Sequence, residues 1–313
     1  MARKIADTKK MTHEEWIKLR KSSIGGSDSG VCVNENPYSS LLTLYADKMG
    51  LSNDKEDNEA MRLGRDLEQY VADRFTEKTG IKVRNDFGMY ADDEYDFMTA
   101  NVDRRIVGEN AGLECKTMSS FLGYNLEAGE IPGHYYAQLQ HYMMVMGFDY
   151  MWICFLVFQR GVYELKVNRN DDYIAQLRKA EIDFWKNHIE KGIAPEPDGS
   201  EASIQTLKDL YPKSSGVEIE ILGLDQMIAD YKAFGEMEKE FAEKKARVQA
   251  QICARLGKAE VGIGTKYGCS WKEQSKPGID TKRLKAEKPD IYAAYSKASN
   301  YRVFRTKQLV KEK

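Results

Sequence analysis

The stretch DFMTANVDRRIVGENAGLECKTM, residues 96–118, has the pattern of a β-hairpin. Two segments suited to strands flank the turn-forming run GENAG at 108–112. Glu114 and Lys116 are two residues apart, so on a strand both side chains leave the same face. Strand pairing brings Asp103, on the preceding segment, close to them. The hairpin therefore predicts two acids and one base gathered at one place.

These three side chains suit a particular chemistry. Acids on neighbouring strands share a hard cation such as Mg²⁺, with Mn²⁺ as the alternative ion, through oxygen ligands. The backbone carbonyl of Cys115, between the acid and the lysine, adds a further oxygen. Lys116 positions water and offsets the charge that grows on a phosphate, which is the apparatus of metal-assisted phosphodiester hydrolysis. Taken alone, the residues leave open a solvated strand face on which a Glu–Lys pair adds slight stability.

Two helical segments offer polar side chains to the same chemistry. Glu68 borders the apolar stripe of a helix expected over 59–80, and a solvated helix acid is the alternative interpretation. Gln138 and Tyr142 are four residues apart in a helix expected over 131–147, so one helix face presents both. An amide in this position can orient water or backbone beside a phosphate. A glutamine at the edge of the core is the alternative.

A glycine pair near the N-terminus indicates a tight turn. Gly25 and Gly26 precede a helix start that Ser27 or Asp28 is expected to cap. Exposed N–H groups at such a start attract a phosphate, and Arg20 would clamp it. The run lacks the G-x4-G-K-[ST] pattern of a P-loop, and no strand precedes it as a dinucleotide fingerprint requires.

The composition narrows the class of protein. The net charge of −2 over 313 residues does not decide for or against DNA as a substrate. The five cysteines form no C-x-x-C pair, which disfavours zinc and iron–sulfur sites and favours reduced thiols in a cytoplasm. No apolar run approaches the ~20 residues of a membrane span, and no secretory signal is expected. His134 and His141 are too far apart on their helix for the usual metal-binding pair and are expected to be structural.

The order of predicted elements indicates the fold class. Helices and strands follow one another as α-α-α-β-β-β-α-β-β-α, which predicts a mixed sheet with helices on its faces. The run IAPEPDGS at 193–200 indicates a domain edge. A long helix over 225–256 is then followed by two short strand-like pieces, a helix and a basic tail at 300–313. We expect one domain over 1–213 and a C-terminal appendage over 214–313. The long helix is expected to pack onto the protein's own core, with assembly or partner binding as the alternative.

Seven motifs carry a family resemblance over residues 12–190. In chain order they are WIKLR (16–20), IGGSD (24–28), NPYSSLLTLYADKMG (36–50), GRDLEQYVADRF (64–75), NVDRRI (101–106), LECKT (113–117) and YYAQLQHYMMVMG (135–147). In this order and spacing the chain resembles the YqaJ-type viral recombinase family, whose relatives include the phage lambda exonuclease. The resemblance implies an α/β fold with a PD-(D/E)XK nuclease core, a central mixed β-sheet flanked by helices, and a C-terminal helical or α+β appendage.

The resemblance also implies a role for each residue that matches the family's motifs. Asp103 and Glu114 correspond to the metal-binding acids, and Glu68 to the helix acid at the edge of the metal site. Lys116 corresponds to the catalytic lysine. Gln138 corresponds to the glutamine of the helix that follows the hairpin.

A second set of correspondences concerns the DNA end. Arg20 and Ser27 correspond to the pair that holds the terminal 5′ phosphate in the lambda-type enzymes. The chain departs from the family at one point, because Asn101-Val102-Asp103-Arg104 stands where Pro-Asp-Gly is common. The acid is retained, but the turn residues beside it are not.

The function implied is a Mg²⁺-dependent deoxyribonuclease encoded by a phage or prophage and acting in the bacterial cytoplasm. It would digest one strand of a DNA duplex from a 5′ end and leave a 3′ overhang for a single-strand annealing protein. Ring-forming self-assembly is expected from the lambda-type relatives. An endonuclease of the same superfamily and a non-catalytic DNA-binding or assembly protein are the alternatives. A Cas4-like nuclease is disfavoured because the cysteines lack cluster spacing.

Overall fold

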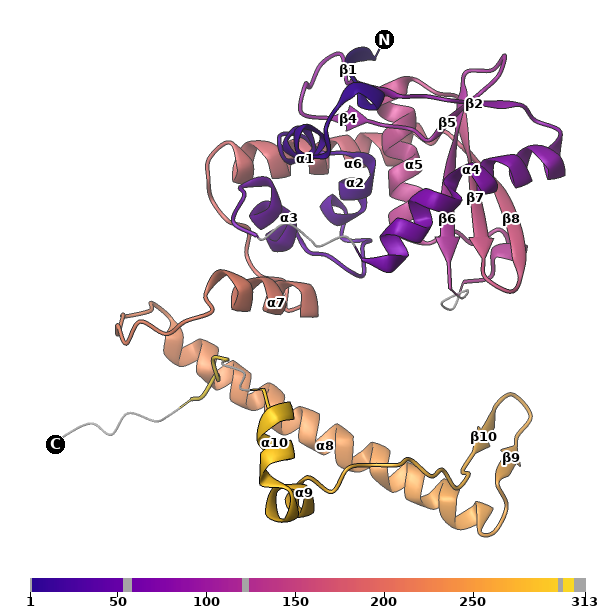
Figure 1. The fold of residues 1–313 in the computed structure, drawn as a ribbon. Coiled ribbons are helices and arrows are strands. Elements are labelled where there is room, and N and C mark those ends of the chain that lie inside the picture. The colour runs from indigo at the N-terminus through magenta and orange to yellow at the C-terminus, as the bar shows by residue number, and fades with distance from the viewer. Residues whose placement is uncertain (1, 53–57, 120–123, 298–300, 307–313) are drawn as a thin grey trace. The chain divides into compact units, whose positions relative to one another are not determined.

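The computed structural model describes residues 2–52, 58–119, 124–297 and 301–306. Within it the chain divides into two compact units, Met1–Tyr211 and Pro212–Lys313 (Figure 1). This division lies close to the boundary expected after residue 213. That the first unit is a nuclease domain stays a prediction. The basic tail lies largely outside the described residues.

The first unit contains both helices and strands, which follow one another largely in runs of one kind. Its helices are α1 (His13–Lys21), α2 (Gly26–Cys32), α3 (Leu41–Lys48), α4 (Glu59–Thr79), α5 (Gly133–Met146), α6 (Asp171–Phe184) and α7 (Glu201–Leu210), with the short turns η1 (Thr8–Lys10), η2 (Leu126–Ala128) and η3 (Trp185–Ile189). Its strands are β1 (Arg3–Asp7), β2 (Val83–Asn85), β3 (Gly88–Ala91), β4 (Thr99–Ala100), β5 (Arg104–Ile106), β6 (Ala111–Met118), β7 (Tyr150–Val157) and β8 (Gly161–Asn168).

The central sheet is mixed, with the strand order β2-β5-β6-β7-β8. β5 and β6 form the predicted antiparallel hairpin, in which Arg104 pairs with Leu113. β6 and β7 run parallel from the pair Ala111–Tyr150 to the pair Met118–Val157. A parallel pair needs a long crossover connection, and α5 lies within it. The predicted class, a mixed sheet flanked by helices, is confirmed.

A second sheet contains a strand that the sequence did not indicate. β1 pairs antiparallel with β3, which in turn pairs with β4. The residues of β1 are exposed or half-buried, so they lack the apolar alternation by which strands are recognised. The strand exists because β3 offers it an edge, which is a tertiary cause.

The two faces of the central sheet differ in what covers them. Helix α4 runs across one face (Figure 1), where Val71, Ala72 and Phe75 are fully buried and pack with Leu113 and Cys154. On the other face, side chains of α5 pack against alternate residues of β7. Because side chains alternate along a strand, β6 sends Leu113 toward α4 and its neighbour Glu114 toward α5.

The predicted apolar stripe of α4 is only partly correct. Val71 and Phe75 are buried as expected, but Met61 and Tyr70 are 46% and 49% exposed. Asn58 is the N-cap residue of the helix, and Gly80, with a positive φ, is its C-cap residue. Burial is confined to the part of the helix that meets the sheet.

The Pro- and Gly-rich run at 193–200 is not a domain edge, contrary to the prediction. The helix α7 that follows it packs on α3 within the first unit. The Thr206 and Thr43 hydroxyls lie 2.8 Å apart, and the Ser203 hydroxyl donates to the Ser40 hydroxyl at 2.9 Å. These contacts hold α7 in the first unit.

The second unit is built around the predicted long helix. It contains α8 (Leu224–Leu256), the hairpin β9 (Val261–Ile263) and β10 (Gly268–Ser270), and the helices α9 (Thr281–Glu287) and α10 (Pro289–Tyr295). No residue of α8 is buried, and Phe234 and Phe241 are 67% and 60% exposed. The expected packing of this helix onto a core is therefore absent within its own unit. None of the helices over the described residues is long and apolar enough to cross a membrane.

Replacement of Phe75 by alanine should destabilise the protein strongly. Phe75 is fully buried and packs edge-on against Trp152, with ring centroids 5.5 Å apart. The cavity left behind should lower the free energy of unfolding by about 3–5 kcal/mol, measured by urea denaturation of the full chain.

The matched control is Tyr70→Ala on the same helix, where the ring is 49% exposed. The Tyr70→Ala replacement should lower the free energy of unfolding by no more than about 1 kcal/mol, as at other surface positions. Equal losses for the two variants would contradict the placement of α4 on the sheet.

Candidate active site

Strand β6 places Glu114 and Lys116 side by side on the face toward α5. The Lys116 ammonium lies 2.7 Å from Glu114 Oε1. The same oxygen accepts a hydrogen bond at 2.7 Å from Nε2 of Gln138, a residue of α5. Glu114 is only 3% exposed. The structure thus brings together three of the residues that the sequence singled out.

The other oxygen of Glu114, Oε2, is buried. Among the residues that the structure describes, it has no hydrogen-bond partner. Buried polar atoms are nearly always hydrogen-bonded, so an exception calls for an explanation such as an ion. A carboxylate oxygen that is buried and free is suited to a hard divalent cation.

Asp103 lies one residue before β5, beside the same acid. Its Oδ2 accepts a hydrogen bond from the Cys115 backbone N–H at 2.8 Å. Burial raises the pKa of Asp103 well above its usual range, and the nearby charges of Glu114 and Glu68 raise that pKa further. Asp103 is half-buried, and a bound cation would relieve the penalty that burial and the neighbouring acids place on its ionised form.

Cys115 contributes its backbone to this place and not its sulfur. Burial raises the pKa of the Cys115 thiol, so the side chain stays neutral. It packs with the apolar cluster under α4. In a strand the N–H and C=O of one residue point to the same side, so the Cys115 carbonyl lies on the side of Asp103. The donor set that fits a cation is therefore two carboxylates and one carbonyl.

Glu68 is placed nearby but has another partner. Its carboxylate forms an ion pair with the Arg104 guanidinium, which is nearly buried. Arg104 also donates to the Asp103 carbonyl at 2.8 Å and to Gln69 Oε1 at 3.2 Å. Over the residues that the structure describes, no three His, Cys, Asp or Glu side chains form a group that could hold a metal ion. In this structure Glu68 therefore lies at the edge of the site, and its carboxylate is engaged by Arg104.

Lys116 is a cation in this setting. Burial lowers the pKa of Lys116, but the carboxylates of Glu114 and Asp103 raise it more, and the net pKa lies above its usual range. Its ammonium also lies over the Tyr135 ring, 5.2 Å from the centroid. A permanent positive charge is suited to stabilising an anionic phosphate and not to removing a proton at neutral pH.

Tyr142 connects the site to helix α2. Its hydroxyl accepts a hydrogen bond from Gln138 Nε2 at 3.1 Å, on the helix face that the two residues share. The Tyr142 ring also packs against Gly26, where a Cβ would lie 2.5 Å from the ring. A glycine is needed there because α2 and α5 approach closely.

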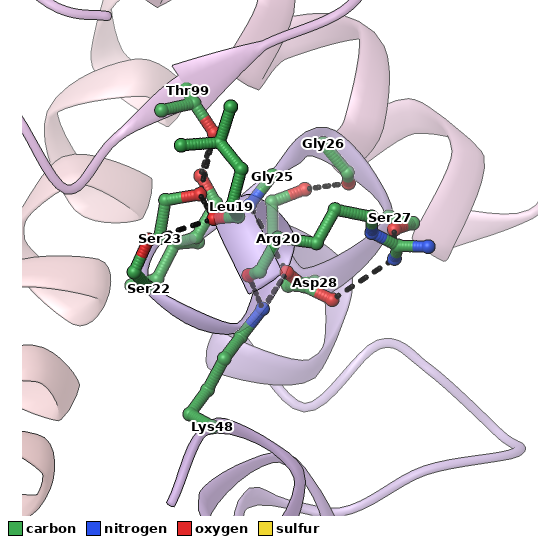
Figure 2. Close-up of polar contacts among 12 residues, drawn as sticks. Leu19, Arg20, Ser22, Ser23, Gly25, Gly26, Ser27, Asp28, Lys48 and Thr99 are labelled. Carbon is green, nitrogen blue, oxygen red and sulfur yellow. Dashed lines mark hydrogen bonds and ion pairs between the residues drawn. The ribbon is translucent and has the colours of Figure 1, made fainter. Parts of the chain in front are cut away.

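Arg20 and Ser27 meet in a second cluster. Arg20 Nη2 donates to Ser27 Oγ at 2.9 Å (Figure 2). The Arg20 guanidinium also lies over the Trp16 ring, 4.9 Å from its centroid, and 3.9 Å from Asp28 Oδ1. Its side chain keeps 42% exposure, so the guanidinium is held in place but accessible.

The helix start in this cluster differs from the prediction. Helix α2 begins at Gly26 with Gly25 as its N-cap residue, so Ser27 does not cap it. Asp28 closes the turn from within the helix, because its Oδ2 accepts from the Gly25 N–H at 3.0 Å. Ser27 is exposed and its hydroxyl is directed to Arg20.

Sequence reasoning missed two charged residues of these clusters. Arg104 pairs with Glu68, and Lys48 pairs with Asp28 at 2.7 Å. Each lies in a motif, but nothing in the local pattern marks its partner. His141, expected to be structural, is fully buried between Glu181 and the Thr99 carbonyl.

Comparison with known proteins places this geometry in context. Residues 15–149 match the family described as the YqaJ-like viral recombinase domain. The chain is similar to the uncharacterized protein YqaJ of Bacillus subtilis (strain 168), with 34% identity over 311 residues that cover 97% of each chain.

Two solved structures are similar to part of this chain. LHK-Exo in complex with dAMP matches with a TM-score of 0.50 and 18% identity, over 57% of this chain and 94% of that chain. A second structure of LHK-Exo, an alkaline exonuclease from Laribacter hongkongensis, matches over the same shares of the two chains with a TM-score of 0.48 and 19% identity.

Replacement of Glu114 by glutamine should weaken the binding of a divalent cation. The change removes the charge of the buried Glu114 carboxylate while keeping the side-chain shape. Calorimetric titration with MnCl₂ should show an affinity about tenfold or more below that of the wild type, because affinity depends on the charge of the ligands.

Glu109→Gln serves as the matched control, because Glu109 lies in the exposed turn of the same hairpin. It should bind Mn²⁺ as the wild type does. If Glu114→Gln bound Mn²⁺ with unchanged affinity, the cation site would not be at this hairpin.

Proposed function

We propose, for a chain that belongs to the YqaJ-like viral recombinase family, that it is a metal-dependent nuclease that digests duplex DNA from an end. One observation carries the proposal above the others. Over the part of the chain that the structure describes, a buried carboxylate oxygen of Glu114 has no hydrogen-bond partner, and it lies in a cluster with a second, half-buried acid and a lysine ammonium. This combination supports hydrolysis of a phosphodiester.

The residues at the hairpin have different roles in the proposed reaction. Asp103, Glu114 and the Cys115 carbonyl would hold a divalent cation, with Mg²⁺ as the expected ion and Mn²⁺ as the alternative. The cation would supply Lewis-acid activation of the phosphate and of water. Lys116 would stabilise the negative charge on the phosphate oxygens. Gln138 would fix the orientation of the Glu114 carboxylate through its hydrogen bond.

The proposed role of Glu68 depends on its ion pair with Arg104. It is expected at the edge of the metal site, but its carboxylate pairs with Arg104. A direct contact between Glu68 and the cation would require the Arg104 guanidinium to give up that pair. We therefore assign Glu68 to the outer edge of the site.

The Arg20 cluster supports a proposal about polarity. The accessible guanidinium and the Ser27 hydroxyl together suit a terminal 5′ phosphate, because arginine binds phosphate through charge-assisted hydrogen bonds. A phosphate held there would set digestion in the 5′ to 3′ direction and leave a 3′ overhang. A single-strand annealing protein in a bacterial cytoplasm would be the partner for that overhang, and a ring of several copies would suit sustained digestion.

Lys116→Ala should reduce hydrolysis sharply. Removal of the ammonium takes away one preorganised group that stabilises the developing charge, for which a loss of about a hundredfold or more is expected. The assay is digestion of linear duplexes in Mg²⁺, labelled at the 5′ or the 3′ end and carrying or lacking a 5′ phosphate. Lys166→Ala, on the exposed face of β8, is the matched control and should digest at the wild-type rate.

The same assay separates the alternatives. Cutting of a closed circular plasmid would favour an endonuclease, whereas an exonuclease leaves it intact. Binding of DNA without hydrolysis by the wild type would favour a non-catalytic role. Undiminished digestion by Lys116→Ala would remove Lys116 from the catalytic assignment.

A further inference from the structure

Lys48 is a buried lysine at the end of α3, away from the hairpin acids. Its side chain is 1% exposed, which is rare for a lysine unless it is paired. The ammonium lies 2.7 Å from Asp28 Oδ2 and donates to the Arg20 carbonyl at 2.8 Å (Figure 2). Lys48 thus contacts both the acid and the backbone of the arginine in the Arg20 cluster.

Asp28 lies beside Arg20 and would disfavour the binding of a phosphate there. Burial raises the pKa of its carboxyl, but the charges of Lys48 and Arg20 lower it more, so the group is ionised at neutral pH. An ionised carboxylate 3.9 Å from the Arg20 guanidinium competes with any phosphate for that guanidinium. It also repels the phosphate directly.

The geometry shows how Lys48 removes this competition. Lys48 and the Gly25 N–H both bind the Oδ2 atom of Asp28. The other oxygen, Oδ1, stays beyond hydrogen-bond distance from Arg20. The charges of Lys48 and Asp28 cancel, so the cluster keeps the one positive charge of Arg20. Arg20 Nη2 donates to Ser27 Oγ, and the side chain keeps 42% exposure to solvent.

We infer that Lys48 sets the preference of this protein for a 5′-phosphorylated DNA end, by neutralising Asp28 and so keeping Arg20 available to the phosphate. Lys48 and Asp28 are positioning residues, because neither faces the phosphate. The inference rests on the proposed function in one respect, which is that the anion at Arg20 is the terminal phosphate of DNA. It does not depend on hydrolysis.

The test compares binding of two duplexes that differ only in a 5′ phosphate or a 5′ hydroxyl at one end. Each carries a fluorophore at the other end, and fluorescence anisotropy in EDTA gives two dissociation constants whose ratio is the phosphate preference. Lys48→Met should reduce the wild-type preference about tenfold, because Asp28 then pairs with Arg20. The ratio is internal to each protein, so a lower folded fraction cancels.

A double variant separates charge from structure. Asp28→Asn with Lys48→Met removes both charges, and such neutral replacement of a buried ion pair is usually tolerated. The asparagine oxygen can still accept from the Gly25 N–H. The phosphate preference should return to within about threefold of the wild type, since the competing charge is gone. Lys179→Met, an exposed lysine on α6 paired with Asp183, controls for the loss of one charge.

Each outcome bears on the inference. An unchanged preference in Lys48→Met, or a double variant as impaired as the single one, would overturn it. If Lys48→Met does not fold, Lys48→Gln takes its place with the same expected loss, because glutamine keeps a donor to Asp28 but no charge. A wild type without phosphate preference would overturn the inference as well, while the digestion assay would still decide the nuclease proposal by itself.

Discussion

The parallel pairing of β6 with β7 determines where the chemically important side chains lie. A parallel pair requires a crossover, and the helix in that crossover, α5, covers one face of β6. Gln138 therefore lies over Glu114, at hydrogen-bond distance. The antiparallel partner β5 begins one residue after Asp103, which places the Asp103 carboxylate against the Cys115 N–H. With a different partner strand, β6 would present the same residues to solvent.

Charge balance in buried places is the second constraint. At the hairpin, two acids face one lysine, and over the described residues Glu114 keeps one carboxylate oxygen without a hydrogen-bond partner. In the Arg20 cluster the sign is reversed, because Lys48 neutralises Asp28 and Arg20 remains. One place thus favours a cation and the other an anion, which is the pair of sites that an enzyme acting on a phosphorylated DNA end would need.

The two clusters are joined through a short path of contacts. Tyr142 packs against Gly26 in α2 and accepts a hydrogen bond from Gln138, which holds Glu114. The close approach of α2 and α5 is possible only because position 26 has no side chain. A displacement of α2 would therefore be transmitted to Glu114 on β6, since packed interiors transmit small displacements.

The sequence by itself determined the features that depend on neighbouring residues. The hairpin, the shared face of Glu114 and Lys116, the helix limits of α4 and the family motifs follow from spacing, turn residues and caps. Only the tertiary structure decided the pairing of Arg104 with Glu68, 36 residues away, and of Lys48 with Asp28, 20 residues away. It also decided that β1 is a strand and that α8 remains exposed within its unit. The physical reason is that local patterns fix backbone conformation and side-chain direction, whereas the partner of a buried charge is fixed by which segments the fold brings into contact.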